Sequence, residues 1–248
     1  MSMTLREEEA DELREYIEES HVKVFAHGTY MDYPWAGKVY PPKFIAQELE
    51  MCSRAGISGL VVHLGKPPID VVMQHLPKLK TEHRDTLIYL ETPHVKPENS
   101  HYETPEKLAE LFTAIRQIDP SLSHFGLCID TAHLWSCGVD IATYEDAEAW
   151  TERLEAVSEI IPPGKLIIHL NDSHDTRGSG LDHHAPLLGG KIWSEFAGDP
   201  SQSGLAAFVH FALRNEIPLL LERKPKEALL NDYAALEKIS GDFRPSGP

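Results

Sequence analysis

Six short apolar runs, each followed by a stretch with helical periodicity, constrain the fold of this 248-residue chain most strongly. The runs are rich in Val, Ile and Leu without alternation, which predicts parallel strands covered by helices. Every run ends in a histidine or a carboxylate: His27, His63, Glu91, Asp130, His169 and Glu222. Because strand C-termini converge on one face of a TIM-type barrel, we expect these side chains to share one site. The predicted class is therefore α/β, a TIM-barrel-like parallel β/α fold that is incomplete, with about six of eight βα units.

The predicted elements alternate along the whole chain. Strands are expected at residues 22–27, 59–65, 86–91, 125–130, 165–170 and 218–222. Helices are expected at residues 5–19, 41–56, 67–80, 103–118, 144–161, 203–216 and 225–239. The length fits one β/α barrel domain over residues 1–248.

The loop that follows the fifth strand is the part of the chain with the most metal-binding residue types. It carries the pair Asp182 and His184, and His133 lies three residues after Asp130. Imidazole nitrogens and carboxylate oxygens suit zinc or manganese. A lone Asp-x-His pair is better interpreted as a solvated polar loop. The recurrence of ligand-type residues at six strand ends favours a shared metal site instead.

Composition limits the classes of function. The formal charge of −16 argues against an ordinary nucleic-acid binder, although bound divalent ions would place positive charge where a phosphate needs it. The absence of long apolar runs predicts a protein without a membrane span. No secretory signal is visible, and the three widely spaced cysteines fit a reducing compartment, so we expect an intracellular, cytoplasmic protein (nuclear if eukaryotic) without disulfides.

The motifs CIDTAH, HLND, LDHH and PLLLE together resemble the endonuclease IV family of apurinic/apyrimidinic endonucleases. The resemblance implies a TIM barrel with three zinc ions, with manganese as the alternative at one site. It assigns nine ligands: His27, His63 and Glu91 for the first ion; Asp130, His169 and Glu222, with Glu91 as a bridge, for the second; His133, Asp182 and His184 for the third. It further implies hydrolysis of the phosphodiester 5′ to abasic sites in double-stranded DNA, with Glu91 orienting the nucleophile.

The resemblance also implies DNA contacts and shows departures. Tyr30 matches an aromatic residue of a DNA-inserting loop, and His183 replaces a basic residue between the loop ligands. After His63 the chain has LGKPP, and after Glu91 it has TPHV, where the family has other sequences. The family's first two βα units have no counterpart before residue 5. We therefore expect exposed strand edges, with a second chain as one way to cover them.

Two other functions remain open. A mononuclear Mn/Mg sugar isomerase or epimerase on the same barrel would use Glu91, Asp130, His169 and Glu222, but it would have no use for the other five ligands. A metal-binding relic without catalysis is the non-enzymatic alternative. Metal content separates the isomerase from the endonuclease, and turnover on an abasic duplex separates the relic.

Overall fold

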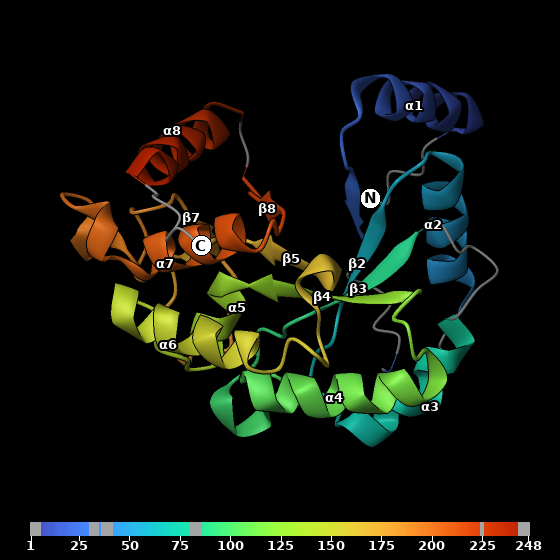
Figure 1. Cartoon of the computed structure of the whole chain (residues 1–248), viewed down its shortest axis with the longest axis horizontal. Helices are drawn as coiled ribbons and strands as arrows, with labels where there is room; N and C mark the ends of the chain where they lie inside the picture. Colours follow the sequence, from blue (N-terminus) through green and yellow to red (C-terminus); the bar gives the residue numbers. More distant parts are fainter. Residues whose placement is uncertain (1–5, 30–34, 36–41, 80–85, 224–225, 243–248) are drawn as a thin grey trace. The chain divides into compact units, whose positions relative to one another are not determined.

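The computed structural model describes residues 6–29, 35, 42–79, 86–223 and 226–242, which form two compact units (Figure 1). Unit 1 comprises Met1–Glu91 and Thr113–Gly126, and unit 2 comprises Thr92–Phe112 and Leu127–Pro248. The single domain expected over residues 1–248 stays a prediction.

Unit 1 is built on three parallel strands. Its elements are α1 (Glu7–Ser20), β1 (Phe25–His27), α2 (Pro42–Arg54), β2 (Gly59–His63), α3 (Ile69–Leu79), β3 (Leu87–Glu91) and the second half of α4 (Pro105–Ile118). The register pairs His63 with Glu91, and His27 with Val61, two residues before His63. Side chains two residues apart on a strand point to the same face, so His27, His63 and Glu91 share one side at the strand ends.

A glycine sets the packing between these strands. A Cβ added at Gly59 would lie 2.4 Å from the ring of Tyr89, which itself packs edge-on against Phe25 with ring centroids 5.6 Å apart. Only glycine leaves room for this aromatic pair. Helices α1 and α2 contact one another on the outside of the unit, where Arg54 forms ion pairs with Glu7 and Asp11.

Unit 2 contains the other strands and the long loop. Its regular elements are η1 (Pro97–Asn99), the first half of α4, β4 (Phe125–Asp130) from Leu127 onward, α5 (Thr131–Ser136), α6 (Tyr144–Glu155), η2 (Pro163–Lys165), β5 (Leu166–His169), β6 (Asp172–Ser173), β7 (His184–Ala185), η3 (Ser194–Phe196), η4 (Pro200–Gln202), α7 (Gly204–Arg214), β8 (Leu219–Leu220) and α8 (Lys226–Asp242). The parallel register places Asp130 beside His169, and His169 beside Leu220.

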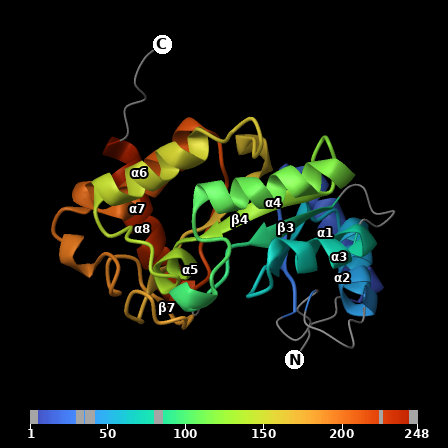
Figure 2. The same cartoon turned by 90° about the horizontal axis from the view of Figure 1, so that it is seen from below.

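Three helices form the outer layer of unit 2. Helix α7 contacts both α6 and α8, and Figure 2 shows the three lying together. Most apolar side chains of α7 are buried, although Leu213 is 42% exposed, and Phe208 packs against Trp150 of α6 with ring centroids 6.1 Å apart.

The predicted class is confirmed: the fold is TIM-barrel-like α/β, with six parallel strands in the described residues. Within those residues the outermost strands β1 and β8 each pair on one side only, as the sequence predicted. Cys52, Cys128 and Cys137 are buried, and no disulfide joins them in the structure. No helix in the described part of the chain is long and apolar enough to cross a membrane.

Some predicted boundaries are wrong. The helix expected over residues 144–161 ends at Glu155, and tight turns then lead to Pro162 and Pro163, which cannot continue a helix. Helix α5 was not predicted, because Asp130 was interpreted only as a ligand and not also as the N-cap that it is. The two-residue strands β6 and β7 within the loop were not predicted either.

Candidate metal centre

Unit 1 brings three of the predicted ligands together. The Nε2 atom of His63 lies 2.7 Å from Oε2 of Glu91, and Nε2 of His27 lies 3.3 Å from the same oxygen. Glu91 is completely buried. The Nδ1 atom of His27 lies 2.8 Å from the carbonyl oxygen of Gly28, so Nδ1–H donates there and Nε2 is left facing the carboxylate. His27, His63 and Glu91 thus form a group whose ligand atoms lie within 4.8 Å of one another.

A second group lies at the strand ends of unit 2. The Nδ1 atom of His169 is 3.3 Å from Oε2 of Glu222 and 3.9 Å from Oδ2 of Asp130. The side-chain amide of Asn171 donates hydrogen bonds to both carboxylates, at 2.7 Å to Asp130 and 3.1 Å to Glu222. Asn171 is itself held by Thr131, whose hydroxyl accepts from its backbone N–H at 2.8 Å. One buried amide therefore orients two carboxylates.

A third group combines α5 with the loop. Oδ1 of Asp182 lies 2.9 Å from Nε2 of His184 and 3.4 Å from Nε2 of His133. The Nδ1–H of His133 donates to the carbonyl oxygen of Thr92 at 2.7 Å, which fixes the ring with Nε2 toward Asp182. Asp130 caps α5 by accepting the backbone N–H of His133, three residues later, at 2.9 Å. This cap places His133 in the first turn of the helix.

The loop that carries Asp182 and His184 is anchored by a different carboxylate. Asp172 is completely buried and accepts backbone N–H groups from Ser173, Gly190 and Ile192 at 2.8–3.0 Å. Burial raises the pKa of Asp172 even though these hydrogen bonds act in the opposite direction. Arg223 donates to the carbonyl oxygen of His184 at 3.2 Å. Asp172 is thus a structural residue of the loop and not one of the ligand groups.

The negative charges around the third group favour a positive charge there. Burial of the His184 ring disfavours its charged form, but the hydrogen bond to Asp182 and the negative charge of Asp130, Asp182 and Glu222 raise its pKa to about 9. Burial also acts on Asp182, yet His133 and His184 hold its pKa well below the usual range. The two shifts share one cause, the close pairing of Asp182 with the imidazoles of His133 and His184, which favours the charged form of each partner.

These donor sets fit divalent zinc. Each group offers imidazole nitrogens together with carboxylate oxygens, the combination that binds zinc in proteins. His27 in the first group and His133 in the third each use Nδ1 for a backbone carbonyl, as metal-bound histidines commonly do. The nine predicted ligands thus lie in close groups, but the second and third groups adjoin, because Oδ2 of Asp130 lies 3.8 Å from Nε2 of His184.

Tyr30 and His183 are the residues predicted to contact DNA. Tyr30 lies outside the described residues. His183 is exposed, and its Nδ1 lies 3.0 Å from Oδ2 of Asp175. The sequence interpretation missed His94, which lies beside His133 and Asp182, and it missed the orienting roles of Asn171 and Thr92. A histidine in the segment TPHV, directly after a ligand-bearing strand, was the signal for His94.

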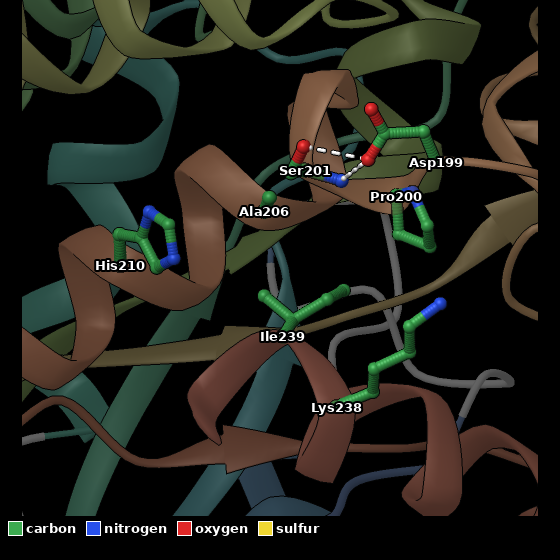
Figure 3. Close-up of a pocket in the computed structure, with 7 residues that line it drawn as sticks. All are labelled: Asp199, Pro200, Ser201, Ala206, His210, Lys238 and Ile239. Carbon is green, nitrogen blue, oxygen red and sulfur yellow. Dashed lines mark hydrogen bonds between the residues drawn. The ribbon is translucent and has the colours of Figure 1, made fainter. Parts of the chain in front are cut away.

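A pocket elsewhere in unit 2 carries no such chemistry. It is lined by Asp199, Pro200, Ser201, Ala206, His210, Lys238 and Ile239 (Figure 3). Asp199 is occupied by hydrogen bonds from the backbone N–H and the hydroxyl of Ser201, at 3.2 and 2.6 Å. None of the nine predicted ligands lines this pocket.

Comparison with known proteins agrees with the fold. The family model described as xylose isomerase-like TIM barrel matches residues 1–216. A probable AP endonuclease of African swine fever virus is 43% identical over 222 residues, which are 89% of this chain and 74% of that protein. The crystal structure of AsfvAP:AG is 40% identical and covers 95% of this chain and 80% of that chain, with a TM-score of 0.88.

A more distant structure agrees in fold. Endonuclease IV from Thermus thermophilus is 24% identical, with a TM-score of 0.73 over 98% of this chain and 85% of that chain. At this identity the similarity concerns the fold alone. The family assignment rests instead on the model match and on the viral relative. The chain thus belongs to the AP endonucleases of the endonuclease IV family, within the xylose isomerase-like TIM barrels.

Proposed function

We propose that this chain is a zinc-dependent DNA repair endonuclease that hydrolyses the phosphodiester 5′ to abasic sites in double-stranded DNA. Membership of the AP endonuclease family makes it a DNA-cleaving hydrolase. The observation that carries the finer proposal is the gathering of nine imidazole and carboxylate ligands into three groups. A mononuclear isomerase has no use for the third group.

The proposed ligand assignment follows the three groups. His27, His63 and Glu91 would hold the first ion, Asp130, His169 and Glu222 the second, and His133, Asp182 and His184 the third. A bridging role of Glu91 between the first two ions stays a prediction of the family resemblance. Manganese stays the alternative occupant of one site.

The protein's own residues position the reacting groups. Bound zinc supplies Lewis acidity, which lowers the pKa of water from 15.7 to about 7 and stabilises charge on a leaving oxygen. Glu91, fully buried and held between two imidazoles, would orient the attacking oxygen. Asn171 keeps two carboxylates in place, and the carbonyl of Thr92 keeps His133 in place. This preorganisation reduces the rearrangement needed during the reaction.

Selectivity for abasic sites follows from the cost of base flipping. Extruding a nucleotide costs a few kcal/mol and costs least where no base is stacked. His183, whose side chain is 67% exposed, and Tyr30 would contact DNA. The second chain expected at the sheet edge has no support in the comparisons and is not part of the proposal.

Metal content and cleavage together test the proposal. We expect about three zinc ions per chain by plasma emission spectrometry and incision of a duplex with one abasic site. The Glu91→Gln variant keeps the shape but loses the charge that offsets the cations, so we expect loss of incision and a weaker first site. One manganese or magnesium ion per chain without incision would favour the isomerase. Three zinc ions without turnover would favour the non-catalytic relic.

A further inference from the structure

His94 lies at the edge of the third ligand group. Its Nδ1 atom is 3.9 Å from Oδ2 of Asp182, and its ring centroid is 4.9 Å from that of His133. One ligand atom from each of these three residues lies within 4.8 Å of the others. The His94 side chain is 26% exposed, so it borders the group and is not buried beneath it.

The distances suit a shared tetrahedral ion. Zinc–ligand bonds of 2.0–2.1 Å place neighbouring ligand atoms roughly 3.3 Å apart. Asp182 lies 3.4 Å from Nε2 of His133 through one oxygen and 3.9 Å from Nδ1 of His94 through the other.

The backbone on both sides of His94 is fixed. The hydroxyl of Thr92 accepts the backbone N–H of Asp130, and its carbonyl accepts from His133. The thiol of Cys137 donates to the carbonyl oxygen of Pro93 at 2.9 Å.

The chain that follows His94 is packed against the ligand-bearing loop. Val95 is buried, and a Cβ added at Gly180 would lie 2.8 Å from the backbone nitrogen of Lys96. Gly180 precedes Asp182 by two residues and has a φ of +70°, which glycine adopts without strain. The position of His94 beside Asp182 is therefore set by the packing of two segments.

We propose that His94 is an additional protein ligand of the ion held by His133 and Asp182, which brings that ion to four protein ligands with His184. The inference rests on the proposed function, because it presumes an ion in the third group. A zinc ion with four protein ligands has no open position, so a substrate phosphate would enter by expansion to five ligands or by displacing one. His94 would then tune how tightly phosphate binds at this ion.

The experiment uses the zinc-loaded full chain and its cobalt-substituted form. Zinc affinity is measured by chelator competition, and the coordination of the third ion by the visible absorption of cobalt. In His94→Ala we expect one of the three ions to bind 10–100-fold more weakly. Removing a residue that only orients a ligand typically costs this much in metal affinity, so removing a ligand should cost at least as much. We also expect a changed cobalt spectrum. The matched control His101→Ala, a histidine outside the ligand groups, should retain all ions with wild-type affinity.

A second variant separates the two levels of the inference. If His133→Ala loses one ion while His94→Ala keeps wild-type affinity and spectrum, the role of His94 is refuted and the third site stands. If neither variant changes metal binding, the third site itself is refuted, and with it the proposed function. Thermal unfolding of the metal-free variants should match wild type, which excludes a folding defect as the cause of a weaker site.

Discussion

Replacement of Asn171 by alanine should weaken the binding of the second ion, although Asn171 is not itself a ligand. Asn171 is 1% exposed, and its amide donates to Asp130 at 2.7 Å and to Glu222 at 3.1 Å. Hydrogen bonds to charged groups contribute about 1.5–3 kcal/mol each, so two such bonds set an upper limit of roughly 6 kcal/mol. Water entering the space left by the amide recovers part of this. We therefore expect a loss of about 3 kcal/mol in the unfolding free energy of the metal-free protein.

The effect on metal binding should follow the pattern for residues that orient ligands. Loss of such a partner typically costs 10–100-fold in metal affinity, about 1.4–2.7 kcal/mol. Chelator competition on Asn171→Ala measures this directly. The control Asn215→Ala removes an asparagine that donates to Glu155 at 2.9 Å, away from the ligand groups, and should leave the affinity unchanged. Affinity of Asn171→Ala within twofold of wild type would refute the reasoning.

An isosteric variant sharpens the same test. Asn171→Asp keeps the shape but places a third carboxylate beside Asp130 and Glu222. Repulsion should destabilise the metal-free protein more than alanine does, because the charge is buried. A bound cation offsets that charge, so zinc should stabilise this variant by more than it stabilises Asn171→Ala. Equal zinc stabilisation in both variants would show that charge is not the deciding quantity.

Three other perturbations have defined outcomes. Gly59→Ala places a methyl group 2.4 Å from the ring of Tyr89 and should cost about 1–3 kcal/mol in urea unfolding, whereas Gly164→Ala, with nothing within 4 Å, should change stability by less than about 0.5 kcal/mol. The ion pair with Arg153 lowers the pKa of Glu106 from 4.5 to about 2. Because the pair is exposed, it contributes less than about 1 kcal/mol to the free energy of unfolding. That contribution is present above pH 4.5 and is lost as the pH falls through 2. Unfolding of Glu106→Gln and wild type, compared at pH 7 and at pH 2.5, checks this. Removal of bound zinc with a chelator should lower Tm by roughly 5–11 °C for each ion that had been present at about 100 Kd, and an unchanged melting curve would argue against a metal-stabilised fold.

The sequence predicted the strand ends well because two independent patterns coincide there. Apolar runs mark buried parallel strands, and a ligand-type residue closes each run. The register then converts sequence position into proximity: His63 pairs with Glu91, and Asp130 pairs with His169. Parallel strands of similar length leave little freedom in this register, so the proximity within these two pairs followed from the strand pattern. The assignment of ligands to separate ions came from the family resemblance instead.

The loops were less predictable because their contacts depend on backbone atoms. The carbonyl of Thr92 orients His133, and any residue type at that position offers a carbonyl. Asp172 resembles the neighbouring ligands in sequence, yet three backbone N–H groups make it a structural anchor. Residue type alone does not separate a carboxylate that binds metal from one that binds its own loop.

The strand ends also explain how the ligands are held. The Nδ1–H of His27 donates to the carbonyl oxygen of Gly28, whose own N–H donates to Val61 at 2.8 Å. A Cβ at Gly28 would lie 2.9 Å from that same Val61 oxygen, so a larger residue would push the two strands apart. The carbonyl that orients His27 would then move with the backbone. Ligand geometry in unit 1 is therefore set by strand pairing, and a substitution at Gly28 should disturb metal binding although it replaces no ligand.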